Sequence, residues 1–141
     1  LNANNLQFIA SSNIPIIVTT PEPTAIADSY AMIKLLSLQH NCNNFLILVN
    51  KIRNLEEFSQ IYTKINNVAS SNLTVTLLPL GGVMSSSMYS DSLYRQEVAI
   101  ANKSNFSGLK TFISMANKIC KFSNYYNFTS NNISNIKDHL D

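Results

Sequence analysis

Three short apolar runs alternate with longer stretches in which apolar positions recur every three or four residues. The runs cover residues 14–18, 45–49 and 73–80 and are rich in aliphatic and β-branched side chains. The first two contain no polar side chain, which is typical of parallel strands buried on both faces. Strand, helix, strand, helix, strand with short connections predicts an α/β fold, an open parallel sheet with right-handed crossovers and helices on both faces.

The two stretches between the strands begin with helix-start signals. Pro21 and Pro23 cannot continue a central strand, but proline is tolerated in the first turn of a helix. The expected inward face of this helix is Ala25, Ile26, Tyr30 and Ile33, joined in part by Met32 or Leu36, with Asp28, Ser29 and Lys34 outward. Asn54 and Glu57 have the spacing of a capping box, so a second helix is expected to run from there to about residue 70. Its predicted apolar stripe is Leu55, Phe58, Ile61, Tyr62, Ile65 and Val68.

Helical patterns also flank this core. We expect the end of a helix at residues 5–10, a short helix at 91–99 and a longer helix at 108–122. The last is predicted to face the sheet with Leu109, Phe112, Ile113, Ala116 and Ile119, and water with Lys110, Asn117, Lys118 and Lys121. Residues 124–141 are expected to form a polar, frayed tail. Its stripe of Ile133, Ile136 and Leu140 lacks the basic opposite face that a membrane-surface helix needs, so weak or no membrane contact is predicted from this tail.

Composition narrows the function classes. The 141 residues are 45% apolar and carry a net charge of +2, which fits one domain and offers no electrostatic case for nucleic-acid binding. Cys42 and Cys120 lack C-x-x-C spacing and are expected to be reduced. His40 and His139 are isolated from each other and from acidic pairs, so neither a metal site nor a catalytic triad is predicted. Without a long apolar stretch or a signal peptide, we expect a cytoplasmic protein.

One stretch resembles a known family. VTTPEPTAIADSYAMIKLL, residues 18–36, is similar to the corresponding segment of the MinD/ParA class of P-loop ATPases, and most similar to the flagellar-number regulators within it. FLILVNKIRN at 45–54 and LTVTLLPLGGV at 73–83 resemble the next two strands of that class. The resemblance implies an ATPase that uses ATP and Mg²⁺ and forms a homodimer when ATP is bound. It also implies control of flagellar number or placement, with flagellar assembly proteins as partners, at the inner surface of the membrane.

The resemblance also implies where a nucleotide would lie. The asparagine of the V-N motif reaches the nucleotide base in this class, which corresponds to Asn50, and the turn after the third strand closes over the base. The base-binding set carried over is Asn50, Arg53, Gly81, Gly82 and Val83, with Lys51 as a possible flanking residue. Thr20, Pro21 and Glu22 are expected near the nucleotide or the dimer face. An amide side chain fits an adenine edge because it offers a donor and an acceptor together.

Other features of the class are missing. A phosphate-binding loop needs several glycines and a G-K-S/T sequence, whereas this chain has three glycines and no such motif. Where the class has L-G-x-I-P-x-D, this chain has LGGVMSS. We therefore expect residues 1–123 to be the carboxyl-terminal half of a nucleotide-binding domain, with the phosphate loop and magnesium ligands before Leu1. This half is predicted to contain no catalytic residue, to be inactive alone, and to expose a sheet edge.

Two alternatives stay open at this point. The chain could be a non-catalytic interaction module that keeps only the binding surfaces of the class. It could equally belong to a division-site or plasmid-partition relative, because these regulators share this half of the domain.

Overall fold

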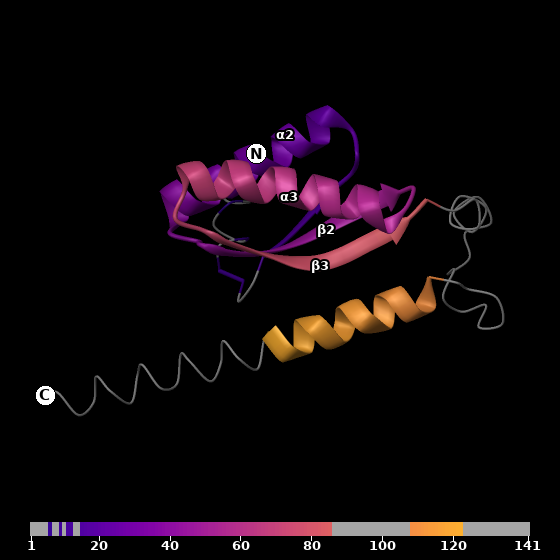
Figure 1. Ribbon diagram of the computed structural model, residues 1–141. Coiled ribbons are helices and arrows are strands. Elements are labelled where there is room, and N and C mark those ends of the chain that lie inside the picture. Colours follow the sequence, from indigo (N-terminus) through magenta and orange to yellow (C-terminus); the bar gives the residue numbers. More distant parts are fainter. Residues whose placement is uncertain (1–5, 7–8, 10, 13–14, 86–107, 123–141) are drawn as a thin grey trace, which may run out of the picture.

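The structure of the chain is a computed structural model that describes residues 6, 9, 11–12, 15–85 and 108–122 (Figure 1). Its elements follow the order β1 (Ile16–Thr19), α2 (Pro23–His40), β2 (Asn44–Ile52), α3 (Leu55–Asn72) and β3 (Thr76–Met84). A further helix covers residues 109–122 and is called here the 109–122 helix. The helix predicted at 91–99 and the tail predicted at 124–141 lie outside the described residues.

The described strands form one parallel sheet in the order β1-β2-β3. Thr19 is the register partner of Val49, and Val49 is in turn the partner of Gly82. The predicted α/β class and open parallel sheet are confirmed. Since all three strands run the same way, their carboxyl ends meet at one edge of the sheet, where ligands bind in folds of this kind.

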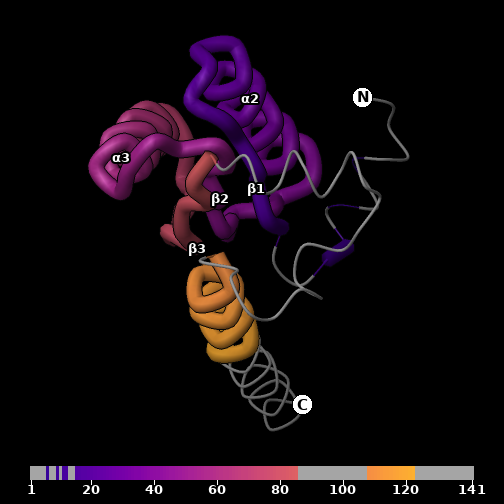
Figure 2. The backbone as a smooth tube through the Cα atoms, turned by 90° about the vertical axis from the view of Figure 1, so that its right-hand side faces the viewer, coloured from indigo at the N-terminus to yellow at the C-terminus, as the bar shows by residue number. Residues whose placement is uncertain are grey.

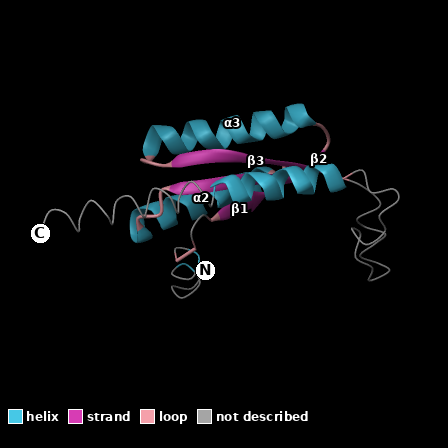
Figure 3. Ribbon diagram, turned by 90° about the horizontal axis from the view of Figure 1, so that it is seen from below, coloured by secondary structure: helices cyan, strands magenta, loops and turns pink. Residues whose placement is uncertain are grey.

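Helices cover both faces of the sheet, as predicted. α2 and α3 lie together on one face, where Ile33 and Ile61 join the larger apolar cluster (Figure 2). The 109–122 helix lies on the opposite face, where Met115 packs with Leu46 and Leu80. Figure 3 shows α2 and α3 running lengthwise along the strands, as expected of crossovers in a layered α/β fold.

β1 is not buried on both faces, which corrects the prediction. Ile17 and Thr19 are buried, whereas Ile16 and Val18 are 40% and 59% exposed. The physical reason is position, because among the described residues β1 pairs only with β2 and forms an edge of the sheet. The 109–122 helix packs on residues of β2 and β3 and does not extend this cover to β1.

The third strand begins and ends later than predicted. It runs from Thr76 to Met84 and therefore passes through Gly81 and Gly82, which the sequence pattern placed after its end. The two glycines remain in the ladder because they pair with Leu48 and Val49 of β2. The predicted turn is thus the last part of a strand.

The buried faces of α2, α3 and the 109–122 helix all differ from the prediction, and the first two are described here. Ser29 is buried, not outward, and its hydroxyl donates a hydrogen bond to the carbonyl oxygen of Ala25 at 2.7 Å. On α3, Ala69 is buried while the predicted inward residues Leu55 and Val68 are 68% and 43% exposed. α3 is therefore rotated slightly from the predicted stripe, and a small alanine lets its last turn approach the sheet.

The 109–122 helix is also rotated. Met115 is its buried residue, whereas Ala116 is exposed and Ile113 is 51% exposed. Lys118, predicted to face water, donates hydrogen bonds to the carbonyl oxygens of Leu80 and Pro79 at 2.9 and 3.4 Å. A flexible methionine suits this position because its side chain can adapt to the irregular surface beside Gly81.

Candidate nucleotide-base site

The carboxyl ends of the three strands bring the predicted site residues to one edge of the sheet. Thr19, Val49 and Gly82 are aligned in register, so the residues that follow them, Thr20, Asn50 and Val83, come at the same level. Thr20 and Asn50 are half-buried and Val83 is buried. The edge combines polar side chains with a glycine-rich strand end.

β2 contains a bulge at this edge. Val49 pairs with Gly82 and Ile52 pairs with Met84, so Asn50 and Lys51 of β2 stand opposite one residue of β3. Lys51 has a φ of 59°, in the left-handed region that non-glycine residues seldom occupy. Pairing resumes beyond the bulge, where the Ser85 N–H donates to the carbonyl oxygen of Ile52 at 2.8 Å. Bulges of this kind redirect side chains and are common beside functional sites.

A local hydrogen bond holds one end of the Asn50 side chain. The backbone N–H of Lys51 donates a hydrogen bond of 2.9 Å to Oδ1 of Asn50. An amide oxygen has two lone pairs, so Oδ1 keeps one acceptor position while Nδ2 keeps its donors. Asn50 is thus an oriented, half-buried amide at a strand end. No pattern in the sequence predicted the left-handed backbone at Lys51, because lysine has no preference for it.

Arg53 is held by a neighbour on α3. Its Nε and Nη2 lie 2.9 and 2.7 Å from Oε1 of Glu57, and its backbone N–H donates to Oε2 of Glu57 at 2.6 Å. The hydrogen bonds from Arg53 lower the pKa of the Glu57 carboxyl, and the same contact raises the pKa of the guanidinium. Asn54 caps α3 by accepting from the Glu57 N–H at 2.8 Å, so the predicted N-cap is confirmed. The Glu57 carboxylate accepts from the N–H of Arg53 and not from that of Asn54, so the reciprocal bond of the predicted capping box is replaced by one to the preceding residue.

Gly82 lies where a side chain would not fit. A Cβ at this position would collide with Cδ1 of Ile52 and lie 3.2 Å from Cβ of Phe58. Ile52 is fully buried, so the clash falls within the core beneath the site. The glycine therefore lets β3 approach β2 and α3 closely. An isolated glycine pair inside a strand pattern is the signal that could have predicted this close approach.

The first strand end contributes the turn that was predicted near the nucleotide or the dimer face. Thr20 and Pro21 are half-buried between β1 and α2, and Glu22 is exposed at the N-cap of α2 without a side-chain capping hydrogen bond. Pro23 is the first residue of the helix. The Glu22 side chain therefore does not cap α2.

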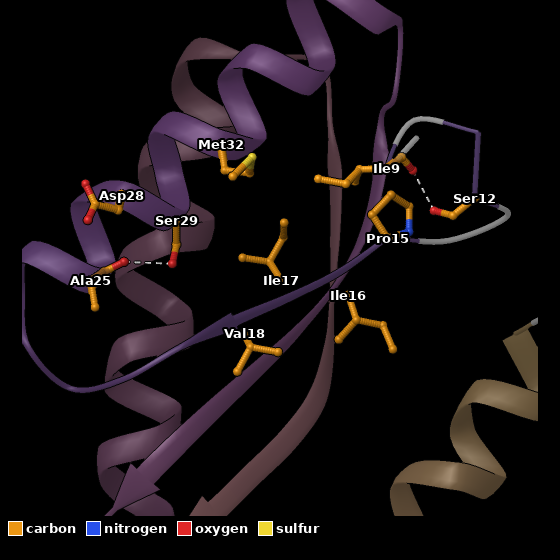
Figure 4. Close-up of a pocket in the computed structure, with 10 residues that line it drawn as sticks. All are labelled: Ile9, Ser12, Pro15, Ile16, Ile17, Val18, Ala25, Asp28, Ser29 and Met32. Carbon is orange, nitrogen blue, oxygen red and sulfur yellow. Dashed lines mark hydrogen bonds between the residues drawn. The ribbon is translucent and has the colours of Figure 1, made fainter. Parts of the chain in front are cut away.

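A separate pocket lies beside β1 and not among the predicted site residues. It has a volume of about 670 Å³ and is lined mainly by apolar groups, including Ile16, Val18 and Met32, with Asp28 and Ser29 at one side (Figure 4). It lies along the side of β1 that no described strand pairs with, so the described residues cover this part of the sheet incompletely. None of Asn50, Arg53 and Gly82 lines it.

Two kinds of site or segment are absent from the described part of the chain. No group of three or more His, Cys, Asp or Glu side chains there could hold a metal ion. No helix among the described residues is long and apolar enough to cross a membrane.

Comparison with known proteins identifies two relatives. The chain is 32% identical over 76 residues to the antiactivator FleN of Pseudomonas aeruginosa, and 33% identical over 89 residues to the flagellum site-determining protein YlxH of Helicobacter pylori. The chain is therefore similar to regulators of the MinD/ParA class, and one of them, YlxH, is named for determining the flagellum site. The matches cover 54% and 62% of this chain, so the resemblance found in the sequence is confirmed over that share. No family model matches the chain.

The matches cover only part of each relative. They span 27% of FleN and 30% of YlxH, so the chain corresponds to less than a third of either protein. The described residues have the α/β architecture expected of one part of a P-loop domain.

Proposed function

We propose that this chain is part of a nucleotide-switched regulator of flagellar number or placement, and that it contributes the base side of an ATP site. The observation that carries this proposal is the similarity to YlxH, whose name describes determination of the flagellum site, and to the antiactivator FleN. The strand-end geometry supports it, because Asn50, Gly82 and the turn at Thr20 meet at the edge where parallel α/β sheets bind ligands.

The residues present fit one half of a nucleotide better than the other. Asn50 offers a half-buried amide that could meet a purine edge, and the strand end at Gly81–Val83 could lie beside the base. The described residues offer no glycine-rich loop for phosphates and no acidic cluster for magnesium. In the complete protein, ATP would therefore be held jointly, with phosphate and magnesium ligands supplied from outside this chain.

Arg53 is proposed to contact the base with only part of its guanidinium group. Its guanidinium is engaged by Glu57, so contact with the base would use the remaining donors or the flat face of the group. The proposed partners of the complete protein are a second copy, in an ATP-bound homodimer, and flagellar assembly proteins. The proposed location is the cytoplasm, with peripheral contact at the inner membrane surface.

The Asn50→Ala variant of the complete protein tests the base site. Losing the amide should weaken ATP binding by about 1–3 kcal/mol, since a purine edge would be left without its polar partner. Calorimetric titration with ATP gives the affinity. Asn44→Ala is the matched control, because Asn44 is the half-buried asparagine at the opposite end of the same strand.

Either of two results would contradict the proposal. Unchanged ATP affinity in Asn50→Ala would place the base elsewhere. Equal weakening in Asn44→Ala would mean that damage to β2, and not loss of a base contact, explains the effect.

A further inference from the structure

The two edges of the described sheet differ in how open they are. β1 forms one edge and β3 the other, because the strand order is β1-β2-β3. At the β1 edge, Ile16 and Val18 are exposed, and the strand contains neither a proline nor a charged residue. An edge of this kind presents backbone groups with which a strand of another chain can pair. The β3 edge has none of this openness.

The backbone of β3 shows which of its groups lie on the outer side. The N–H of Thr76 donates a hydrogen bond of 2.7 Å to the carbonyl oxygen of Asn43, so the backbone of Thr76 faces the β2 side. The pairing then runs unbroken to Pro79. Because the backbone groups of successive strand residues point to opposite sides, those of Leu77 and Pro79 point to the outer edge. Pro79 thus places its missing N–H at this edge, which is where a sheet tolerates proline.

Two side chains occupy carbonyl groups along the same stretch of β3. The hydroxyl of Tyr62, on α3, donates a hydrogen bond of 2.8 Å to the carbonyl oxygen of Leu77. The ammonium of Lys118 donates to the carbonyl oxygens of Leu80 and Pro79 at 2.9 and 3.4 Å. α3 and the 109–122 helix lie on opposite faces of the sheet (Figure 2), so these contacts reach β3 from both faces.

These features all oppose the pairing of a further strand with β3. A strand that approached the outer edge would find no donor at Pro79, and it would have to displace Tyr62 and Lys118 from the carbonyl groups that it needs. Proline and lysine are also the residues with which sheet proteins commonly block an edge. The three residues come from a strand and two helices, so their convergence on one edge is a tertiary feature.

We propose that Tyr62, Pro79 and Lys118 form an edge guard, which prevents β3 from pairing with a strand of a second copy of the protein. Strand addition to this sheet is therefore restricted to the β1 side. The edge guard is independent of the proposed nucleotide site, because it concerns the outer edge of β3 and not the ends of the strands.

The test measures self-association of the complete protein by sedimentation velocity, without nucleotide, so that the proposed ATP-bound homodimer does not contribute. The double variant Tyr62→Phe/Lys118→Met removes both donors but keeps most of the side-chain volume. Its associated fraction should be several-fold higher than that of the wild-type protein. Tyr30→Phe/Lys121→Met is the matched control, because it makes the same chemical changes at a half-buried tyrosine of α2 and an exposed lysine of the 109–122 helix.

A third substitution tests the proline. Pro79→Ala restores a backbone N–H at the outer edge, and since Pro79 is exposed, the smaller side chain leaves no cavity in the core. Adding it to the double variant should raise the associated fraction further. Circular dichroism identifies any variant that fails to fold, and Pro79→Ala alone keeps the test decisive if the double variant does so, because it leaves both donors in place.

Hydrogen exchange read by mass spectrometry locates the contact. In the folded triple variant, peptides from β3 should become more protected as the protein concentration rises, whereas peptides from α2 should not. Association that follows from lost stability alone would not protect β3 selectively.

Three results would overturn the edge guard. The first is an associated fraction no higher in the guard variants than in the control, and the second is a rise without added protection of β3. The third is concentration-dependent protection of β3 in the wild-type protein, because the edge would then pair with all three residues in place.

Discussion

The ammonium group of Lys118 donates a hydrogen bond of 2.9 Å to the carbonyl oxygen of Leu80, which lies 38 residues earlier in the chain. Leu80 is the extra residue of a second bulge, because Ile47 pairs with Pro79 and Leu48 pairs with Gly81. A bulge leaves carbonyl groups without their ladder partners. Lys118 thus joins the 109–122 helix to an irregular part of β3 by satisfying such a group.

Replacing Lys118 by methionine should destabilise the chain by about 1 kcal/mol, since the stem is kept but the donors to the bulge are lost. Urea denaturation followed by circular dichroism measures the change. Lys121→Met is the control, because Lys121 is exposed on the same helix. Equal stability of Lys118→Met and Lys121→Met would show that the bulge carbonyls are satisfied without Lys118.

Gly82→Ala should destabilise the chain by about 1–3 kcal/mol, because the added methyl group would overlap Ile52 and crowd Phe58. Ile52→Val removes the Cδ1 atom at the point of overlap. The double variant should therefore be more stable than the sum of the two single effects predicts. Additive effects in urea denaturation would mean that Ile52 is not the source of the clash.

The stability contributed by Glu57 should depend on pH. Folding lowers the pKa of its carboxyl through hydrogen bonds from Arg53, so the ionised form favours the folded state. This contribution is present above the ordinary glutamate pKa of about 4.3 and is lost as the pH falls through the lowered folded value. Glu57→Gln should thus be less stable than wild type at pH 7, and this difference should shrink at about pH 2.

Glu56→Gln is the control for that experiment. Glu56 is the preceding residue of the same helix turn and is exposed, with Gln60 as its hydrogen-bond partner at 3.2 Å. Its substitution should not produce the same pH-dependent difference in the free energy of unfolding. A difference for Glu57→Gln that stayed constant with pH would rule out ionisation as the cause.

The edge of β1, which no other described strand covers, should make the isolated 141-residue chain self-associate. Val18 is 59% exposed on this edge strand, which carries no charge or proline to block pairing with another chain. Val18→Lys should therefore reduce light scattering at a given protein concentration. Val68→Lys on α3 is the control, because Val68 is also exposed but lies on a helix. Equal reduction by both variants would indicate a general charge effect instead of edge pairing.

Local sequence alone determined the type and order of the main elements. The apolar runs at β1 and β2 predicted strands, and the prolines before α2 and the Asn54–Glu57 spacing predicted where helices begin, because these signals act within a few residues. The same local reading identified Asn50 as a strand-end amide and linked the chain to the MinD/ParA class. Whether these residues bind a nucleotide stays a prediction.

Only the tertiary structure decided how these elements meet. Exposure of Val18 depends on which strand lies at the edge, and burial of Ser29, Ala69 and Met115 depends on how each helix is rotated on the sheet. The contact of Lys118 with Leu80 and the left-handed backbone at Lys51 arise from two bulges in strand pairing. Register between strands is set by contacts across the sheet, so no local pattern in one strand could determine it.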